Sequence, residues 1–148
     1  MEKKNYSPSE GARSNGLVTQ ISVFLENRPG TLREATSILS EAGINLRALN
    51  IAETSDYGVL RLITEDPERT AEVLRGQGFL AARTTVLELQ VPDEPGGLDR
   101  VLRVIAENGF DIEYMYSIMV SQGGSAGMIF RVREPEKLWE ILKEAENG

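Results

Sequence analysis

The feature that most constrains the fold of this 148-residue chain is an internal repeat. Three pairs of segments match, the first two at a spacing of 66 residues and the third at 68: ENRPGTL (26–32) with PDEPGGL (92–98), EAGINL (41–46) with ENGFDI (107–112), and DPER (66–69) with EPEK (134–137). Self-similarity at a fixed spacing indicates a duplicated structural unit. The chain is therefore predicted to contain two copies of one fold.

Each copy opens with the alternation of a half-buried strand, at residues 20–25 and 86–91. After a Pro-Gly pair the apolar spacing becomes helical: Leu32, Ala35, Ile38, Leu39 and Ala42 in the first copy, and Leu98, Val101, Leu102, Ile105 and Ala106 in the second. The expected helix signals are Asn27 and Asp93 as N-caps, Pro29 and Pro95 in the first turn, and Gly43 and Gly109 as left-handed C-terminal caps.

The rest of each copy reads strand, strand, helix. Second strands are expected at about 45–54 and 111–120, each followed by a turn and a third strand, and the second helices start near Pro67 and Pro135. A last strand of the first copy, near 79–84, runs almost directly into the second copy, which leaves no room for a final strand of its own. Seven strands are predicted.

The fold class is therefore α+β. It consists of two ferredoxin-like βαββαβ units packed side by side, with antiparallel sheets and helices on one face. The expected domains are a mobile N-terminal arm at 1–16, a first domain at 17–84 and a second at 85–148 whose final strand is missing.

Composition excludes several classes of function. The chain has no Cys and no His, which removes thiolate nucleophiles, zinc knuckles and the usual proton shuttle at neutral pH. A net charge of -7 argues against nucleic acid as a partner. No apolar run reaches the length of a spanning helix and no secretory signal is visible, so no membrane association is expected and the cytoplasm is the expected location.

At these motifs the sequence resembles the ACT domain, a small-molecule-sensing module of amino-acid metabolism. The marks of that family are an N-x-P-G-x-L turn into a helix and G-x-N at the second strand: Asn27, Pro29, Gly30, Leu32, Gly43 and Asn45 in the first copy, with Asp93, Pro95, Gly96, Leu98, Gly109 and Asp111 in the second. The resemblance covers about residues 17–145 and is closest to stand-alone bacterial proteins with two such domains. Both amides have become acids in the second copy.

The resemblance implies a cytoplasmic regulatory protein, not an enzyme, that binds a free amino acid at the interface of its two domains, without cofactor or metal. The free N–H groups at the helix start could hold an α-carboxylate. The second strand is expected to start beside that turn, where Asn45 or Asp111 could accept from an α-ammonium. The predicted ligand-binding residues are Asn27, Pro29, Gly30, Thr31, Leu32, Ile44, Asn45, Leu46, Asp93, Gly96, Gly97, Leu98, Phe110, Asp111 and Ile112. The same residues are also compatible with a tight turn and local backbone contacts alone.

The sequence also allows other functions to be considered. The small subunit of acetolactate synthase begins with similar elements but continues into a different second domain, and a structural dimerisation module needs no ligand. An acylphosphatase on the same fold requires a G-x-V-x-G-V-G-F signature that is absent. The expected partners are an amino acid, a regulated enzyme and a second copy of the chain in a homodimer.

Charges reverse sign between equivalent positions of the copies: Arg28 with Glu94, Arg33 with Asp99, Glu34 with Arg100, and Arg47 with Glu113. This pattern suggests pairing between the two copies, although solvated surface charges would explain it equally well. The carboxylates of Glu65, Asp66 and Glu68 are interpreted as the acidic start of a helix, not as metal ligands. The GGSAG segment at 123–127 is interpreted as a hairpin turn, not a phosphate loop.

Overall fold

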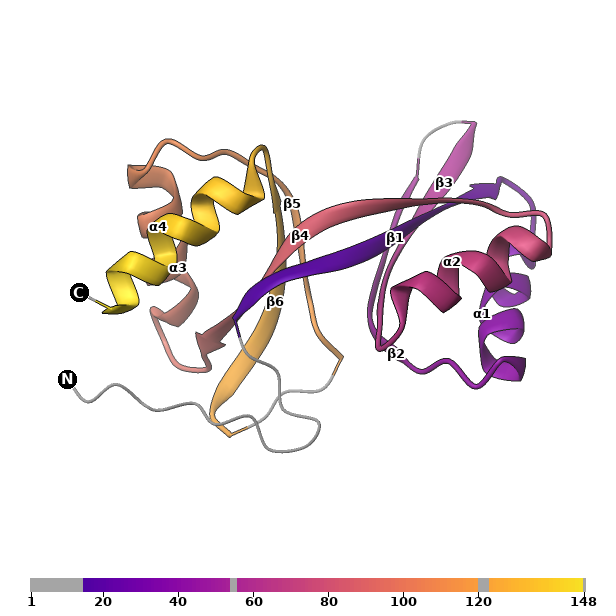
Figure 1. Cartoon of the computed structure of the whole chain (residues 1–148), viewed down its shortest axis with the longest axis horizontal. Helices are drawn as coiled ribbons and strands as arrows, with labels where there is room; N and C mark the ends of the chain where they lie inside the picture. Colours follow the sequence, from indigo (N-terminus) through magenta and orange to yellow (C-terminus); the bar gives the residue numbers. More distant parts are fainter. Residues whose placement is uncertain (1–14, 54–55, 120–122, 148) are drawn as a thin grey trace. The chain divides into compact units, whose positions relative to one another are not determined.

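Six strands and four helices make up the described part of the chain, residues 15–53, 56–119 and 123–147 of a computed structural model (Figure 1). In order they are β1 (Gly16–Glu26), α1 (Thr31–Glu41), β2 (Leu46–Glu53), β3 (Tyr57–Thr64), α2 (Pro67–Gly76), β4 (Leu80–Pro92), α3 (Gly97–Glu107), β5 (Ile112–Ser117), β6 (Ser125–Val132) and α4 (Pro135–Asn147). The prediction of seven strands is wrong, because β4 runs without a break through the two strands expected at 79–84 and 86–91.

The first unit comprises Thr19–Thr84. Its strand β3 pairs antiparallel with both β1 and β2, and β1 is hydrogen-bonded on its other side to β4, whose residues 80–84 belong to this unit. The order of elements is therefore βαββαβ, which confirms the ferredoxin-like prediction for this copy.

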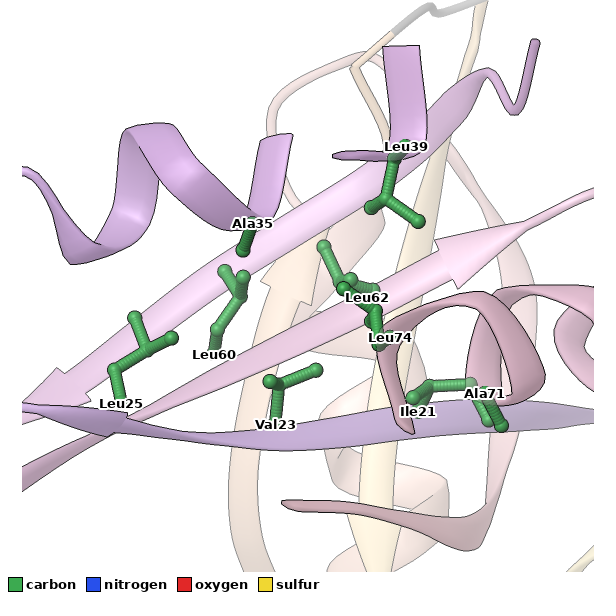
Figure 2. Close-up of a cluster of buried hydrophobic side chains, with 9 residues drawn as sticks. All are labelled: Ile21, Val23, Leu25, Ala35, Leu39, Leu60, Leu62, Ala71 and Leu74. Carbon is green, nitrogen blue, oxygen red and sulfur yellow. The ribbon is translucent and has the colours of Figure 1, made fainter. Parts of the chain in front are cut away.

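Helices α1 and α2 both cover one face of the first unit's sheet (Figure 2). The buried side chains between these helices and the sheet form one cluster: Ile21, Val23, Leu25, Ala35, Leu39, Leu60, Leu62, Ala71 and Leu74. Alternate residues of β1 supply one side of this cluster, as the period-two pattern predicts. The helices supply the other side, through Ala35 and Leu39, four positions apart on α1, and through Ala71 and Leu74 of α2.

The second unit contains the described residues from Thr85 onward together with Asn15–Val18. Strand β6 pairs antiparallel with β4 and β5, and α3 and α4 share a core with them through Leu87, Leu89, Ile105, Phe130, Val132 and Leu138. The start of β1 lies beside β4 here, where the Gln90 N–H donates to Asn15 Oδ1 at 2.6 Å. This segment provides the strand that the sequence of the second copy lacks, so residues 15 and 16 do not belong to the arm expected at 1–16, and the rest of that arm lies outside the described residues. No helix within the described ranges is long and apolar enough to cross a membrane.

The helix starts differ from their predicted form. Residues Gly30 and Gly96, not Asn27 and Asp93, are the N-caps of α1 and α3. Both glycines are left-handed, with φ of 88° and 85°, and neither helix start has a side-chain cap. The prolines therefore precede the helices instead of lying in their first turn. The predicted C-terminal caps are confirmed by the positive φ of Gly43 and Gly109.

The core of the first unit yields a stability prediction. The Leu39 side chain is 1% exposed, so Leu39→Ala should lower the free energy of unfolding by about 2–5 kcal/mol. Leu32 belongs to the predicted apolar stripe of the same helix but is 36% exposed, and Leu32→Ala should cost under about 1 kcal/mol. Urea unfolding of the two variants checks this, and equal losses would contradict the observed core.

Candidate functional site

The turn between β1 and α1 carries the candidate site. Gly30 turns the chain into the helix, and a Cβ at this position would meet no atom within 4 Å. Glycine is therefore required here by its backbone angle and not by a close contact with the chain. The hydroxyl of Thr31 donates to the Arg28 carbonyl at 2.9 Å, which ties the turn to the first residue of α1.

Arg28 forms ion pairs with residues on both sides of this turn. Its Nη1 and Nη2 donate to the two carboxylate oxygens of Glu34 at 3.2 and 2.9 Å, and its Nε donates to Glu26 at 3.1 Å. The hydrogen bond from Arg28 lowers the pKa of Glu34 below its usual value. The pKa of Arg28 is raised, most by its hydrogen bonds to Glu34 and next by its hydrogen bond to Glu26. Both side chains of the Arg28–Glu34 pair are half exposed, so a solute can reach them.

A cavity of about 350 Å³ lies beside this ion pair within the first unit, and its size is within the range of small-molecule sites. Its lining comes from the end of β1, the start of α1 and the segment between α2 and β4: Phe24, Leu25, Glu26, Arg28, Thr31, Glu34, Gln77, Gly78, Phe79 and Leu80. The cavity thus combines an apolar wall with one cationic and two anionic side chains.

The segment after α2 reaches the cavity through a left-handed turn. Gly78 has a φ of 90°, and the N–H groups of Gln77 and Phe79 both donate to the Leu74 carbonyl at 3.1 Å. This turn packs Phe79 against the core cluster of the first unit and leaves Leu80 72% exposed at the start of β4. Phe24, on the facing end of β1, is 43% exposed and contacts Tyr57 ring to ring at 6.0 Å.

The predicted ligand residues of the first copy fall into two groups. Thr31 lines the cavity, and Asn27, Pro29, Gly30 and Leu32 lie exposed around the same turn. The second group, Ile44, Asn45 and Leu46, follows α1 and lies at its far end.

The expectation that β2 starts beside the turn is wrong within this unit. Strands β1 and β2 both pair antiparallel with β3, so they run parallel to each other. The 11 residues of α1 separate the turn from Asn45 by roughly 16 Å along the helix. A small ligand at the turn therefore does not reach Asn45 of the same unit.

The equivalent turn of the second unit is tighter. A Cβ on Gly97, the counterpart of Thr31, would lie 2.0 Å from the Pro92 carbonyl oxygen. The Asp93 N–H donates to the Gly124 carbonyl of the β5–β6 connection at 2.9 Å. Gly97 is buried, and the predicted residues Asp93, Gly96 and Leu98 are exposed. The other predicted residues, Phe110, Asp111 and Ile112, lie at the far end of α3, as their counterparts do in the first unit.

Most of the residues whose charge reverses between the copies form ion pairs within their own unit. Arg100 donates to Glu94 at 2.6 Å, so the Arg28–Glu34 pair reappears with its two charges exchanged. Another reversed position, Arg47 with Glu113, also has partners within the units: Arg47 lies 3.9 Å from Glu65, and Glu113 lies 4.0 Å from Arg131. Ion pairs inside each unit account for three of the four reversed positions, and pairing between the copies stays a prediction.

Sequence reasoning missed most of the cavity lining. Arg28 and Glu34 stand out in the sequence only for their reversed charges, and no motif marks Gln77, Phe79 or Leu80. The usable signal was Gly78, since a glycine just after a helix and before an aromatic residue indicates a left-handed turn with a packed side chain.

The carboxylates near α2 behave as predicted, with Asp66 accepting from the Arg69 N–H at 3.1 Å as the N-cap. The described ranges contain no acidic cluster that could hold a metal ion.

Comparisons with known proteins agree with this architecture. A family model described as an ACT domain pair matches residues 17–147. A crystal structure of a protein from Bacteroides thetaiotaomicron is 38% identical with a TM-score of 0.82, covering 89% of this chain and 90% of that one. The regulatory subunit of aspartate kinase from Thermus thermophilus is 14% identical with a TM-score of 0.60, covering 88% and 97%, and at this identity it shows the fold alone. No curated protein matches the chain.

The difference between the two turns predicts unequal costs of adding a methyl group. Gly30→Ala should lower the free energy of unfolding by about 1–2 kcal/mol, because only the left-handed backbone is strained. Gly97→Ala should cost more, about 3 kcal/mol, because the Pro92 carbonyl must move. Chemical denaturation at pH 7 measures both losses. A Gly97→Ala variant as stable as Gly30→Ala would contradict the tight second turn.

The Arg28–Glu34 pair predicts a pH dependence. Because the folded-state pKa of Glu34 is lowered, its contribution to stability is present above the unfolded pKa of about 4.3 and is lost as pH falls through the folded value. Carbon-13 NMR titration of the Glu34 carboxyl should show the lowered pKa, and Arg28→Gln should return it toward the usual value. Arg100→Gln, which removes the exchanged pair of the second unit, is the control and should leave the Glu34 titration unchanged.

Proposed function

This chain belongs to the ACT domain-pair family, and on that premise we propose that it is a non-catalytic regulatory protein that senses a free amino acid. The ligand binds at the turn from Asn27 to Leu32 in the first unit. The bound protein then acts on an enzyme of amino-acid metabolism. Membership of the family supports the class of function, and the geometry of the turn supports the place of binding.

The observation that carries the proposal is the open helix start at Gly30. The Thr31 N–H donates to the Arg28 carbonyl at 3.5 Å, but the first turn of α1 has no side-chain cap, so the N–H groups that follow Thr31 are suited to an anion such as an α-carboxylate. A methyl group added to the Gly30 Cα would find no protein atom within 4 Å, so the space beside the turn is open. Arg28 adds a positive charge on the same turn, and the adjoining cavity gives the rest of the ligand a place to bind.

The second turn is not part of the proposed site. The space at this turn is limited by the close approach of Gly97 to the Pro92 carbonyl and by the hydrogen bond from the Asp93 N–H to the Gly124 carbonyl. Asn45 lies too far from the turn of its own unit, so in this proposal it contacts such a ligand only from a second copy of the chain. A homodimer would allow this. The expected stoichiometry is one amino acid for each chain.

Regulation follows from a difference in affinity between states. A ligand changes a protein's conformational equilibrium only to the extent that it binds one state better than another. Binding at the turn contacts both β1 and α1, so it favours the arrangement of these two elements that best fits the ligand. Ligand binding would then change the populations of the conformations that present a surface to the enzyme, without any reaction at the site.

Isothermal titration with each of the twenty amino acids tests the proposal. At least one should bind at millimolar concentration or tighter, with one site per chain and a matching rise in melting temperature. Gly30→Ala should weaken that binding by about tenfold, since it disturbs the turn.

Gly109→Ala is the matched control, because Gly109 is also left-handed, with open space around it, at the end of α3 in the second unit. This variant should bind as the wild type does. No binding of any amino acid at millimolar concentration, together with unchanged melting temperatures, would contradict the proposed function and favour a structural dimerisation module.

A further inference from the structure

The cavity at the first turn narrows the class of ligand. Resting on the proposed function, we propose that the ligand is an α-amino acid with an uncharged, apolar side chain. Its side chain fills the cavity between the end of β1 and the segment after α2. Its carboxylate and ammonium groups take the places of Glu34 and Arg28 as partners in the existing ion pair.

The wall of the cavity is apolar where the ligand's side chain would lie. Leu25 is buried and Phe79 packs against the core, so this part of the wall is already held in place. Phe24 and Leu80 are 43% and 72% exposed at its edge. Covering such surfaces with an apolar side chain removes apolar area from water on both partners. A charged side chain in the same place would lose hydration without gaining an opposite charge from this wall.

The polar part of the cavity matches the two charges of an amino acid. Arg28 offers a planar guanidinium that suits a carboxylate in two parallel hydrogen bonds, as it now binds Glu34. Glu26 and Glu34 offer carboxylates to an ammonium group. One cation and two anions line the cavity, so a ligand with an additional negative charge meets net repulsion.

Opening the present ion pair costs little. Arg28 and Glu34 are both about half exposed, at 49% of their side-chain surface each, and exposed pairs contribute little to stability. A zwitterion that inserts between them replaces one pair of opposite charges with two. The turn is also held by the bond from Thr31 to the Arg28 carbonyl, so the backbone does not depend on the ion pair.

The test compares ligands that keep or lose one charge. The probes are L-leucine, L-phenylalanine, 3-phenylpropanoate, 2-phenylethylamine, L-aspartate and L-lysine, titrated calorimetrically against the full chain. L-leucine or L-phenylalanine should bind, and the probes that lack the ammonium or the carboxylate should bind at least about tenfold more weakly. L-aspartate and L-lysine should bind at least about tenfold more weakly than the better apolar amino acid.

Variants then locate the binding. Arg28→Gln and Glu34→Gln should each weaken binding of the apolar amino acid by about tenfold. Leu80→Asp, at an exposed position that tolerates change, should weaken it as strongly by placing a charge on the wall. Glu94→Gln and Arg100→Gln remove the exchanged pair of the second unit and are the matched controls, with unchanged affinity expected.

The outcomes separate this inference from the proposed function. If L-aspartate or L-lysine binds best, or if Arg28→Gln and Leu80→Asp bind as the wild type does, the apolar ligand class is wrong while amino-acid sensing stands. If no amino acid binds, both proposals fail. Melting curves of the variants show whether each is folded, and the exposed position of Leu80 keeps one arm of the test independent of the ion pair.

Discussion

The architecture depends on one backbone constraint, the left-handed glycine between the first strand and first helix of each unit. With φ of 88° at Gly30 and 85° at Gly96, the chain reverses within a few residues and the helix returns over its own strand. In the first unit this return places Ala35 and Leu39 on the same core as Val23 and Leu25. A residue with a Cβ adopts this angle only at a cost, so the position is strongly restricted to glycine.

The same constraint leads to two different turns because the next residue differs. Thr31 follows Gly30, and its hydroxyl anchors the turn from the side while leaving the helix start open. Gly97 follows Gly96 and lets the chain close against the Pro92 carbonyl. One substitution at the first helical position therefore separates an open turn beside a cavity from a tight turn, without any change in the fold that surrounds them.

Local signals in the sequence predicted the repeat, the order of the elements and the glycines that end α1 and α3, because each depends on a few neighbouring residues. The fourth strand of the second unit could not be predicted in this way, since Asn15 meets Gln90 across 75 positions of the chain. The cavity has the same character. Phe24 and Phe79 come from segments with separate local patterns, and only tertiary packing shows that both line one space. The prediction of the helix N-caps was wrong for a local reason. Asn27 and Asp93 are favoured N-cap residue types, but the observed N-caps are the left-handed glycines three positions later.

The exchanged ion pairs show how one fold can carry two kinds of turn. Exposed pairs of this sort contribute little to stability, so either order of charges keeps the unit folded. The order matters for an anion, however. In the first unit the cation, Arg28, lies on the turn before the positive end of α1, so the two favour the same negative group. In the second unit Glu94 occupies that place and opposes an anion at α3. Folding permits both orders, and only the proposed binding of an anion distinguishes them. The charge order and the open turn therefore point to the same unit.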